Sequence, residues 1–321
     1  MKKIVAIFLT VAFAAFALAG CGETDSVSEP VNVAVLNGPT GMGAVQLVDM
    51  TDKYNVETYE APTDIAPKLI SGEVDVAALP SNMAAVLYNK TEGKVVAITP
   101  ITLGVLYIVG NDTDIKSVED LKGKTIVSSG QGGTPEYALQ KILDNANLTM
   151  GEDVTVEWLA SHADVNQKLL SEQGTIAMVP EPFVSAATSG SADVKILFDM
   201  NELWKEATGE DFPMGVLVAT KDFAENRSGD LEVFLNDLKS SIDYVNEDSD
   251  EAAQLIVDKG FLGDVNIARK AIPGCSLVCY TGEERADGIE MLKVFNKTMF
   301  EINPQSVGGK LPGDDLYFEA P

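Results

Sequence analysis

A stretch of 31 residues recurs in this chain at a spacing of 100 residues. Segments 56–86 and 156–186 align without a gap, and 8 of their 31 pairs are identical. The identical pairs are Val56/Val156, Glu57/Glu157, Asp64/Asp164, Lys68/Lys168, Leu69/Leu169, Ser71/Ser171, Ala77/Ala177 and Pro80/Pro180. Each copy has the pattern of a strand, a polar loop, an amphipathic helix, an apolar strand and a proline-containing corner. The repeat predicts two α/β lobes built alike and facing each other across a cleft. The alternative is that two unrelated strand–helix–strand segments share a common pattern.

The length and composition limit the classes of function that are possible. A chain of 321 residues, 45% of them apolar, is typical of a globular protein with about two domains. The formal net charge is −26. Without the two lysines at the extreme N-terminus, 23 − 2 = 21 basic residues face 49 acidic ones, a balance of about −28. Nucleic acid binding needs a basic surface, so this charge argues against it. The charge does not by itself indicate an acidic active site.

The N-terminus has the pattern of a bacterial export signal. Two lysines precede a 15-residue apolar run, Ile4–Leu18, which is short for a membrane span. The run ends in LAGC, which resembles a lipobox and implies diacylglycerol attachment at Cys21. Each buried acyl CH₂ contributes roughly 0.8 kcal/mol, so two chains would anchor the protein to a membrane. The sequence therefore predicts a signal peptide over 1–20 and a polar tether over 21–30. The alternative is an ordinary secreted protein with a chance cysteine.

The remaining cysteines and the only histidine give little support to catalysis or metal binding. Cys275 and Cys279 could form a disulfide across a turn, or both could be buried thiols. His162 is the only histidine, and it has no Gly-x-Ser-x-Gly motif or cysteine partner with which to form a hydrolytic triad. A histidine-dependent metal site is excluded by count. We expect no catalytic residue, no metal site and no cofactor.

Two apolar segments have the length to pass from one lobe to the other. The first is 95–110 and the second is 213–220. They divide the chain into a first lobe of residues 31–107 plus 216–321 and a second lobe of residues 108–215. The C-terminal third has helical patterns with apolar faces, and we expect these helices to complete the first lobe.

Several of these features together resemble one family. They are the lipobox, the duplicated unit, the two connecting segments, the corner Pro180-Glu181-Pro182 and the stretch DLKGKTIVSSGQGGTPEYAL. The chain resembles type II solute-binding lipoproteins of ABC importers, in the branch for nitrate, sulfonate, taurine and thiamine precursors. The resemblance covers the chain from residue 31 onward. It implies an α/β fold of two Rossmann-like lobes joined by two hinge strands, the type II periplasmic binding protein fold. It also implies a monomer that delivers a solute to a membrane permease and is not an enzyme.

The resemblance places a ligand where strands end and helices begin, as the rule for open α/β sheets also expects. The implied ligand-binding residues on the first lobe are Asn37, Thr40, Gly41, Met42, Thr63, Ser81 and Asn82. On the second lobe they are Ser129, Gly130, Gly132, Thr134, Pro135, His162 and Glu181, and Met214 is expected as an apolar wall. In the repeat, Ser81 aligns with Glu181 and Thr63 with Ala163, beside His162.

The candidate loops point to a small polar solute without fixing its charge. Converging helix N-termini favour an anion or a polar head group. None of the candidate residues is Lys or Arg, which argues against a strongly charged ligand. Glu181 would repel an anion if it faces the cleft; alternatively it points to solvent or caps its helix. His162 is either a ligand contact or a surface residue. The glycine spacing of the loop 37–43 departs from the dinucleotide fingerprint.

We therefore expect a small polar or heterocyclic, sulfonate-like solute. Two other functions stay open: a pyrimidine-synthase-like enzyme on the same lobes, and a ligand-sensing lipoprotein without a transporter.

Overall fold

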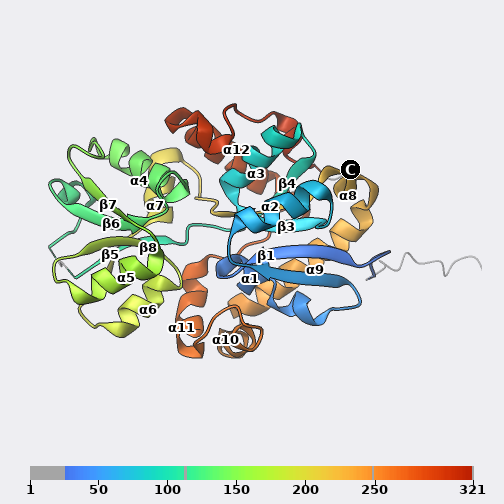
Figure 1. Ribbon diagram of the computed structural model, residues 1–321, viewed down its shortest axis with the longest axis horizontal. Coiled ribbons are helices and arrows are strands. Elements are labelled where there is room, and N and C mark those ends of the chain that lie inside the picture. Colours follow the sequence, from blue (N-terminus) through green and yellow to red (C-terminus); the bar gives the residue numbers. More distant parts are fainter. Residues whose placement is uncertain (1–25, 112–113, 248, 320–321) are drawn as a thin grey trace, which may run out of the picture.

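The computed structural model describes residues 26–111, 114–247 and 249–319. The predicted signal peptide and Cys21 lie outside the described residues. Two α/β lobes lie side by side along the long axis of the molecule (Figure 1). Among the described residues, none of the helices combines the length and the apolar character that crossing a membrane requires.

The first lobe is built on a five-stranded sheet in the order β2-β1-β3-β10-β4. Its strands are β1 (Val31–Leu36), β2 (Tyr54–Tyr59), β3 (Val76–Pro80), β4 (Val95–Thr102) and β10 (Gly215–Thr220). β1 pairs with β2 and β3 in parallel, and β10 runs antiparallel to both β3 and β4. β3 and β4 are buried along almost their whole length, as their continuous apolar sequences predict.

The second lobe repeats this arrangement in the order β7-β6-β8-β5-β9. Its strands are β5 (Leu106–Gly110), β6 (Thr125–Ser129), β7 (Thr155–Leu159), β8 (Ile176–Pro180) and β9 (Lys195–Asp199). Here β6 pairs with β7 and β8 in parallel, and β5 runs antiparallel to β8 and β9. The two copies of the sequence repeat therefore occupy equivalent places in two sheets of the same topology. The predicted α/β fold with two similar lobes is confirmed.

Helices cover both faces of each sheet (Figure 1). In the first lobe they are α1 (Pro39–Gly43), η1 (Val45–Asp49), α2 (Pro62–Ser71), α3 (Ser81–Thr91), α8 (Lys221–Asn226), α9 (Ser228–Glu247), α10 (Ser249–Asp258), α11 (Val265–Ala271), η3 (Ile272–Cys275), η4 (Gly282–Glu284), α12 (Arg285–Ile302), η5 (Pro304–Val307) and η6 (Asp314–Leu316). In the second lobe they are η2 (Val118–Leu121), α4 (Thr134–Asn145), α5 (His162–Ser171), α6 (Phe183–Gly190) and α7 (Met200–Thr208). The helices of the C-terminal third pack on elements of the first lobe, and α11 and α12 also contact α6 and α4 of the second.

The two lobes share an aromatic contact. Trp204 of α7 stacks on Phe212 with ring centroids 4.5 Å apart, and both rings lie near Phe295 of α12. All three side chains are fully buried and belong to one hydrophobic cluster that includes residues of both sheets. This contact joins the lobes beside the second connecting segment.

The chain passes between the sheets at residues 103–105 and 209–214. The boundary that the sequence places between 107 and 108 falls inside β5, all of which pairs in the second sheet. The boundary between 215 and 216 falls after the first residue of β10. Near the first connection, Leu103 N–H donates to the Ser276 carbonyl and the Ser276 hydroxyl donates to the Gly104 carbonyl. Residues 103–105 are Leu, Gly and Val within a long run of mainly apolar residues, so the apolar pattern could not mark where the first sheet ends.

The structure decides between the two possibilities for the cysteines. Cys275 and Cys279 are both free and both buried. Burial raises the pKa of Cys279 to about 12 and that of Cys275 well above its usual value. They are unreactive packing residues rather than a disulfide.

Candidate functional site

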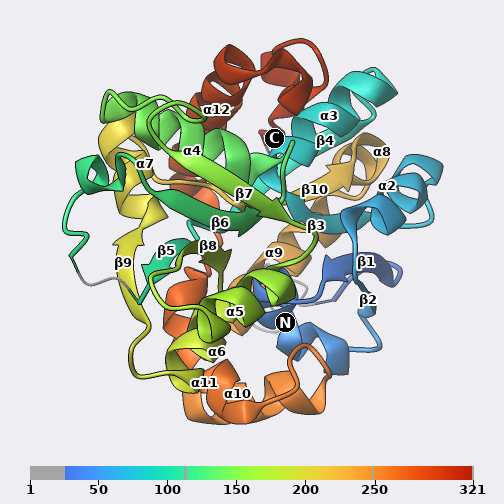
Figure 2. The same ribbon diagram turned by 60° about the vertical axis from the view of Figure 1, so that its left-hand side comes forward.

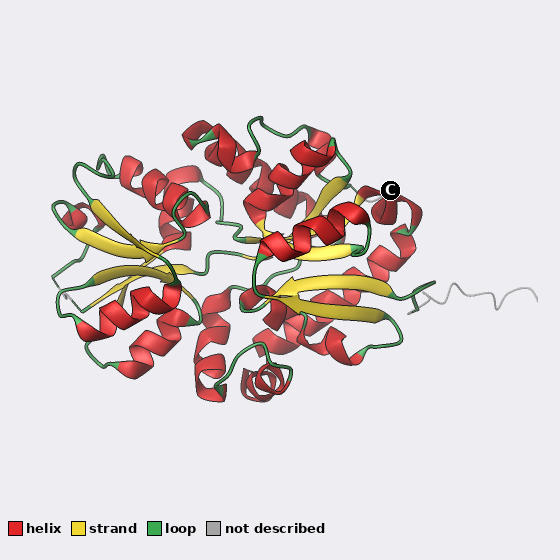
Figure 3. Ribbon diagram, in the orientation of Figure 1, coloured by secondary structure: helices red, strands yellow, loops and turns green. Residues whose placement is uncertain are grey.

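The candidate residues lie at the carboxyl ends of the parallel strands of each sheet. These strands point from each lobe toward the other (Figure 3), so the loops that follow them meet where the lobes face each other. The direct contacts between these loops define the candidate site.

On the first lobe the site begins at the corner between β3 and α3. Ser81 N–H donates to the Met214 carbonyl at 3.1 Å, which ties this corner to the second connecting segment. The Ser81 side chain is 1% exposed, and its buried hydroxyl has no hydrogen-bond partner among the described residues. Pro80 is the N-cap of α3, and neither Ser81 nor Asn82 caps the helix with its side chain, although both are residue types that often do. A buried hydroxyl without a partner costs about 1–3 kcal/mol, which makes Ser81 unusual in a well-packed region.

Asn82 connects the two lobes. Its Nδ2 donates to the Ser306 carbonyl of the first lobe at 3.1 Å. Its Oδ1 accepts from Thr134 Oγ1 of the second lobe at 3.3 Å. The N-terminal ends of α3 and α4 therefore lie next to each other. The first N–H groups of a helix have no acceptor within the helix, so two sets of free donors come together here.

The loop between β6 and α4 supplies the second-lobe side of this junction. Gly130 and Gly132 have φ values of +85° and +78°, which favour glycine, and both are exposed. Thr134 is the first residue of α4 rather than its N-cap, which is Gly133; Pro135 follows it in the first turn. The Thr134 hydroxyl is thus free to bond across the lobe boundary instead of capping its own helix.

Ser129 and His162 form a pair on the same edge of the second sheet. Ser129 Oγ and His162 Nδ1 are 2.7 Å apart, and the His162 ring lies 5.4 Å from the Phe183 ring. Ser129 is almost fully buried, and burial lowers the pKa of His162, so the ring is neutral at pH 7. Among the described residues, no carboxylate is bonded to the ring, so the third member of a catalytic triad is missing from this part of the chain.

Glu181 follows β8 at the position equivalent to Ser81. Its carboxylate accepts from Ser185 N–H and from Ser185 Oγ, each at 3.0 Å, and Ser185 lies in the first turn of α6, whose N-cap is Pro182. The side chain is 5% exposed, so it does not point to solvent. Burial raises the pKa of Glu181 to about 7, against the effect of the Ser185 hydrogen bonds and the charge of Lys270.

The loop after β1 is used mainly for packing. A Cβ on Gly41 would lie 2.5 Å from the Phe261 ring, and Met42 is fully buried in the core of the first lobe. Close packing, rather than approach of a ligand, therefore explains this glycine. The Thr40 hydroxyl donates to the Leu36 carbonyl at 3.1 Å and does not cap α1, whose N-cap is Gly38.

Asn37, Thr63 and Met214 stand at the edges of the site. Asn37 is exposed and its Nδ2 donates to Glu60 Oε1 at 2.7 Å. Thr63 is exposed in the first turn of α2. Met214 is half-buried in the second connecting segment, where its backbone bonds both Ser81 and Thr102.

Three further contacts between the lobes have no signal in the sequence. Asn303 Nδ2 donates to the Tyr137 hydroxyl at 2.7 Å. The Tyr107 hydroxyl donates to the Gly274 carbonyl at 3.2 Å, and Lys270 Nζ donates to Ser189 Oγ at 3.1 Å. The partners in these pairs are 81 to 167 residues apart in the chain, so no local pattern could identify them.

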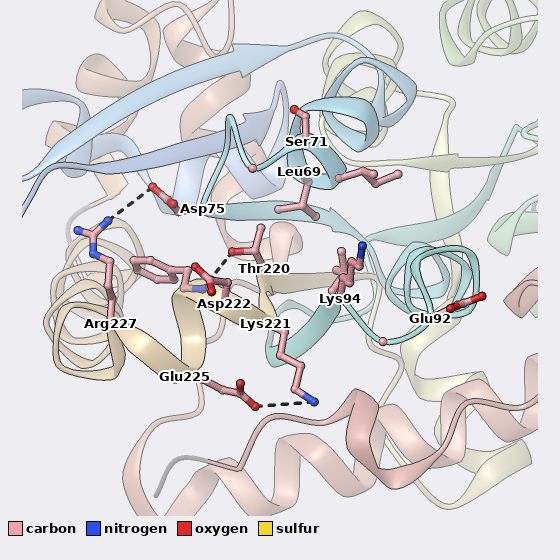
Figure 4. A pocket seen from close by; sticks show the side chains of 15 residues that line it. Leu69, Ser71, Asp75, Glu92, Lys94, Thr220, Lys221, Asp222, Glu225 and Arg227 are labelled. Atoms are coloured by element: carbon pink, nitrogen blue, oxygen red, sulfur yellow. Dashed lines mark hydrogen bonds and ion pairs between the residues drawn. The ribbon is translucent and has the colours of Figure 1, made fainter.

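Two surface grooves lie elsewhere, at equivalent places on the two lobes. The groove on the first lobe has a volume of about 570 Å³ and lies between the C-terminal end of α2 and the start of α8 (Figure 4). Two ion pairs line this groove: Arg227 Nη1 lies 3.9 Å from Asp75 Oδ2, and Lys221 Nζ lies 3.7 Å from Glu225 Oε1. None of the candidate residues lines either groove. These grooves are at the amino ends of the parallel strands, away from the candidate site.

The comparisons with known proteins agree with this architecture. Residues 50–262 match the model of a family described as ABC transporter, phosphonate, periplasmic substrate-binding protein. The chain belongs to this family. The predicted resemblance to solute-binding proteins of ABC importers is therefore confirmed, and the family is one of transport proteins. No curated protein matches the chain.

Solved structures extend the likeness to nearly the whole chain. An ABC transporter structure from Parabacteroides distasonis is 24% identical, covers 90% of this chain and 99% of its own, and has a TM-score of 0.77. The periplasmic aliphatic sulphonate binding protein SsuA from Escherichia coli is 17% identical, with coverage of 91% and 97% and a TM-score of 0.68. At these identities the likeness shows the fold alone. The matched family is one of periplasmic substrate-binding proteins, which agrees with the predicted location outside the cytoplasm.

Proposed function

We propose that this substrate-binding protein holds a small organic solute with a sulfonate- or phosphonate-like group between its lobes, and that it delivers the solute to an ABC permease. Both groups present three oxygens on one tetrahedral centre, and both occur in the names of the family and of its structural relatives. The proposal narrows the small polar or heterocyclic solute expected from the sequence. Differential affinity of the solute for the closed lobes would supply the free energy of closure.

The unpartnered hydroxyl of Ser81 carries the proposal. It lies at the first residue of α3, beside the Asn82–Thr134 bond that joins the N-termini of α3 and α4. These helices have 11 and 12 residues, so each offers free N–H donors and a partial positive charge at its start. An oxyanion placed here would accept from the hydroxyl and from the helix N–H groups together.

The neutral character of the donors favours a singly charged group. None of the candidate residues is Lys or Arg, and the acidic candidate residue, Glu181, is buried. A sulfonate carries one negative charge, whereas a phosphonate carries up to two. Each helix N-terminus contributes about 0.3–1 kcal/mol to binding an anion, up to about 2 when partly buried. We therefore expect sulfonates to bind more tightly than phosphonates of the same size.

Native mass spectrometry of the gently purified protein tests the class of solute. A retained sulfonate or phosphonate is the expected result. A retained heterocycle without an oxyanion would contradict the proposed head group but not the binding role. Conversion of an added solute into a product would instead support the pyrimidine-synthase-like alternative.

Titration calorimetry with methanesulfonate and methylphosphonate tests where the solute binds. The double variant Ser81→Ala, Thr134→Ala should lose most of the affinity for the better probe. Ser240→Ala is the matched control, because Ser240 is exposed on α9 and its hydroxyl bonds only its own helix. Unchanged affinity in the double variant would show that the solute does not bind at the α3–α4 junction.

We also propose that the protein acts as a monomer tethered by lipid at Cys21, with residues 1–20 removed. The LAGC pattern supports this, since it combines a short apolar run with a cysteine at its end. Cys21→Ser should shift the protein from the membrane fraction to the soluble fraction of its native host. Uptake of labelled solute by cells with and without the permease would separate transport from a sensing role.

A further inference from the structure

Glu181 belongs to the second lobe, but residues of the first lobe cover it. A Cβ built on Gly274 would lie 2.8 Å from Glu181 Oε1 and 3.0 Å from its Cγ, so the Gly274 backbone rests on this side chain. The Gly274 carbonyl accepts from the Tyr107 hydroxyl at 3.2 Å. Next to this contact, α11 of the first lobe packs on α6 of the second (Figure 2). Contact between the lobes therefore completes the burial of the Glu181 carboxyl.

The contact provides no positive partner for that carboxyl. Both of its hydrogen-bond donors belong to Ser185 of α6, the helix that follows it in the same lobe. Within the described ranges Glu181 has no ion pair, and Lys270 of α11 is exposed and donates to Ser189 instead. The other ionisable groups facing it are the Tyr107 phenol on β5 and the Cys275 thiol on η3, both uncharged at neutral pH.

The ionisable groups near the Tyr107 phenol cannot compensate the negative charge of Glu181 either. Asp199 and Glu202 lie near the Tyr107 phenol and are acidic. An ionised carboxylate buried among such neighbours loses hydration without gaining a counterion, which costs several kcal/mol unless the group binds a proton.

We propose that closing the lobes over Glu181 takes up one proton, so that this carboxyl makes closure of the binding protein dependent on pH. The inference rests on the proposed function, because it assumes that the lobes open and close around a solute. In the structure, where Gly274 covers Glu181, burial raises the pKa of this carboxyl to about 7, and we take this arrangement as the closed one. When Gly274 moves away, water reaches the carboxyl and its pKa returns toward the ordinary value of about 4.3.

The sign of the effect follows from these two states. The closed state has the higher pKa, so it binds more protons and is favoured as the pH falls. The advantage is complete at a pH below the open-state pKa and is lost as the pH rises through about 7. Because one pKa unit corresponds to a tenfold change, we expect the closing equilibrium constant to be about tenfold or more larger at pH 5 than at pH 8.

Energy transfer between dyes on the two lobes measures closure without any solute. The dyes are attached through Ile70→Cys and Leu170→Cys, two exposed and equivalent positions, in the full chain with Cys21→Ser. Cys275 and Cys279 are buried and do not compete for the dyes. The labelled protein is compared from pH 5 to pH 8 with its Glu181→Gln, Gly274→Ala and Glu152→Gln variants.

Each comparison has one expected result. Transfer efficiency should rise toward pH 5 in the parent and in the control Glu152→Gln, whose carboxyl is exposed on the same lobe. Glu181→Gln, which imitates the protonated carboxyl, should remain closed at every pH. Gly274→Ala should remain open, because its new Cβ has no room beside Glu181.

A parent that does not respond to pH, or a Glu181→Gln variant that responds like the parent, would overturn the inference. So would a Gly274→Ala variant that closes normally, or a Glu152→Gln control that loses the response. If the protein nevertheless retains a solute in native mass spectrometry, the proposed function stands and only the proton linkage is wrong.

Discussion

Ser81→Ala should have opposite effects on the stability of the free protein and on its affinity for solute. The Ser81 hydroxyl is buried without a partner, and the side chain is 1% exposed. Leaving a buried hydroxyl unpaired costs about 1–3 kcal/mol, so its removal should leave the free energy of unfolding unchanged or raise it by up to this amount. The hydrogen bond to an anionic solute is worth about 1.5–3 kcal/mol, so affinity should fall about tenfold or more.

Ser306→Ala provides the matched control in the same lobe. Ser306 is also buried, but its hydroxyl is bonded to the carbonyls of Met299 and Asn303 at 3.0 and 2.7 Å. Its removal should lower the free energy of unfolding by about 0.5–1.5 kcal/mol, because the hydrogen bonding of this hydroxyl is lost. Urea unfolding of both variants without solute, and titration calorimetry with methanesulfonate, measure the two effects. If Ser81→Ala lost as much stability as Ser306→Ala, the hydroxyl would already be satisfied in the free protein and the reasoning would be refuted.

Three further substitutions test the first connecting segment, the hydrogen bond between Asn82 and Thr134, and the buried histidine. Gly104→Ala should lower the free energy of unfolding by about 1–3 kcal/mol in urea unfolding, because its Cβ would lie 2.4 Å from Asn201 Cβ. The control is Gly229→Ala in α9, where the new Cβ meets open space and should raise the free energy of unfolding by about 0.4–1 kcal/mol. Thr134→Val should weaken solute binding about fivefold in calorimetry by removing the bond to Asn82, and Thr134→Ser should restore it; equal loss in both would rule out the hydroxyl. Burial lowers the pKa of His162, so the folded protein favours the neutral ring. The protein should therefore lose stability as the pH falls below about 6.5, the pKa of an unfolded histidine. This loss should be smaller in His162→Gln, and an equal dependence of stability on pH in the two proteins would contradict the reasoning.

The repeat made the architecture predictable because strand and helix periodicity depends on local sequence. Val76 and Ile176 occupy equivalent register positions in the two sheets, where they pair with β1 and β6 respectively. The Pro80 and Pro180 corners end equivalent strands. Local propensity could not place the caps to within one residue. Thr134 and Ser81 have the residue types of N-caps, yet each is the first residue of its helix, and the N-caps are Gly133 and Pro80.

The roles of individual residues at the site were less predictable than their positions. Met42 and Gly41 lie in a loop whose composition is typical of ligand binding, but the helices of the C-terminal third pack directly on them. Glu181 was expected to face the cleft, to point to solvent or to cap its helix. It accepts from Ser185 in the first turn of α6 and is buried, because Gly274 from the other lobe covers it. Neither the packing on Gly41 and Met42 nor the burial of Glu181 depends on the residues next to them in the sequence.

The sequence by itself determined that the chain forms two similar α/β lobes and where their strand ends fall, since these follow from a repeat of apolar spacing. It also determined the shortage of positive charge among the candidate residues. Only the tertiary structure decided which of those residues meet. The bonds between Asn82 and Thr134 and between Tyr137 and Asn303, and the cover of Gly274 over Glu181, join residues that are 52 to 166 positions apart or belong to different lobes. Such contacts depend on how two folded lobes lie against each other, which no local pattern encodes.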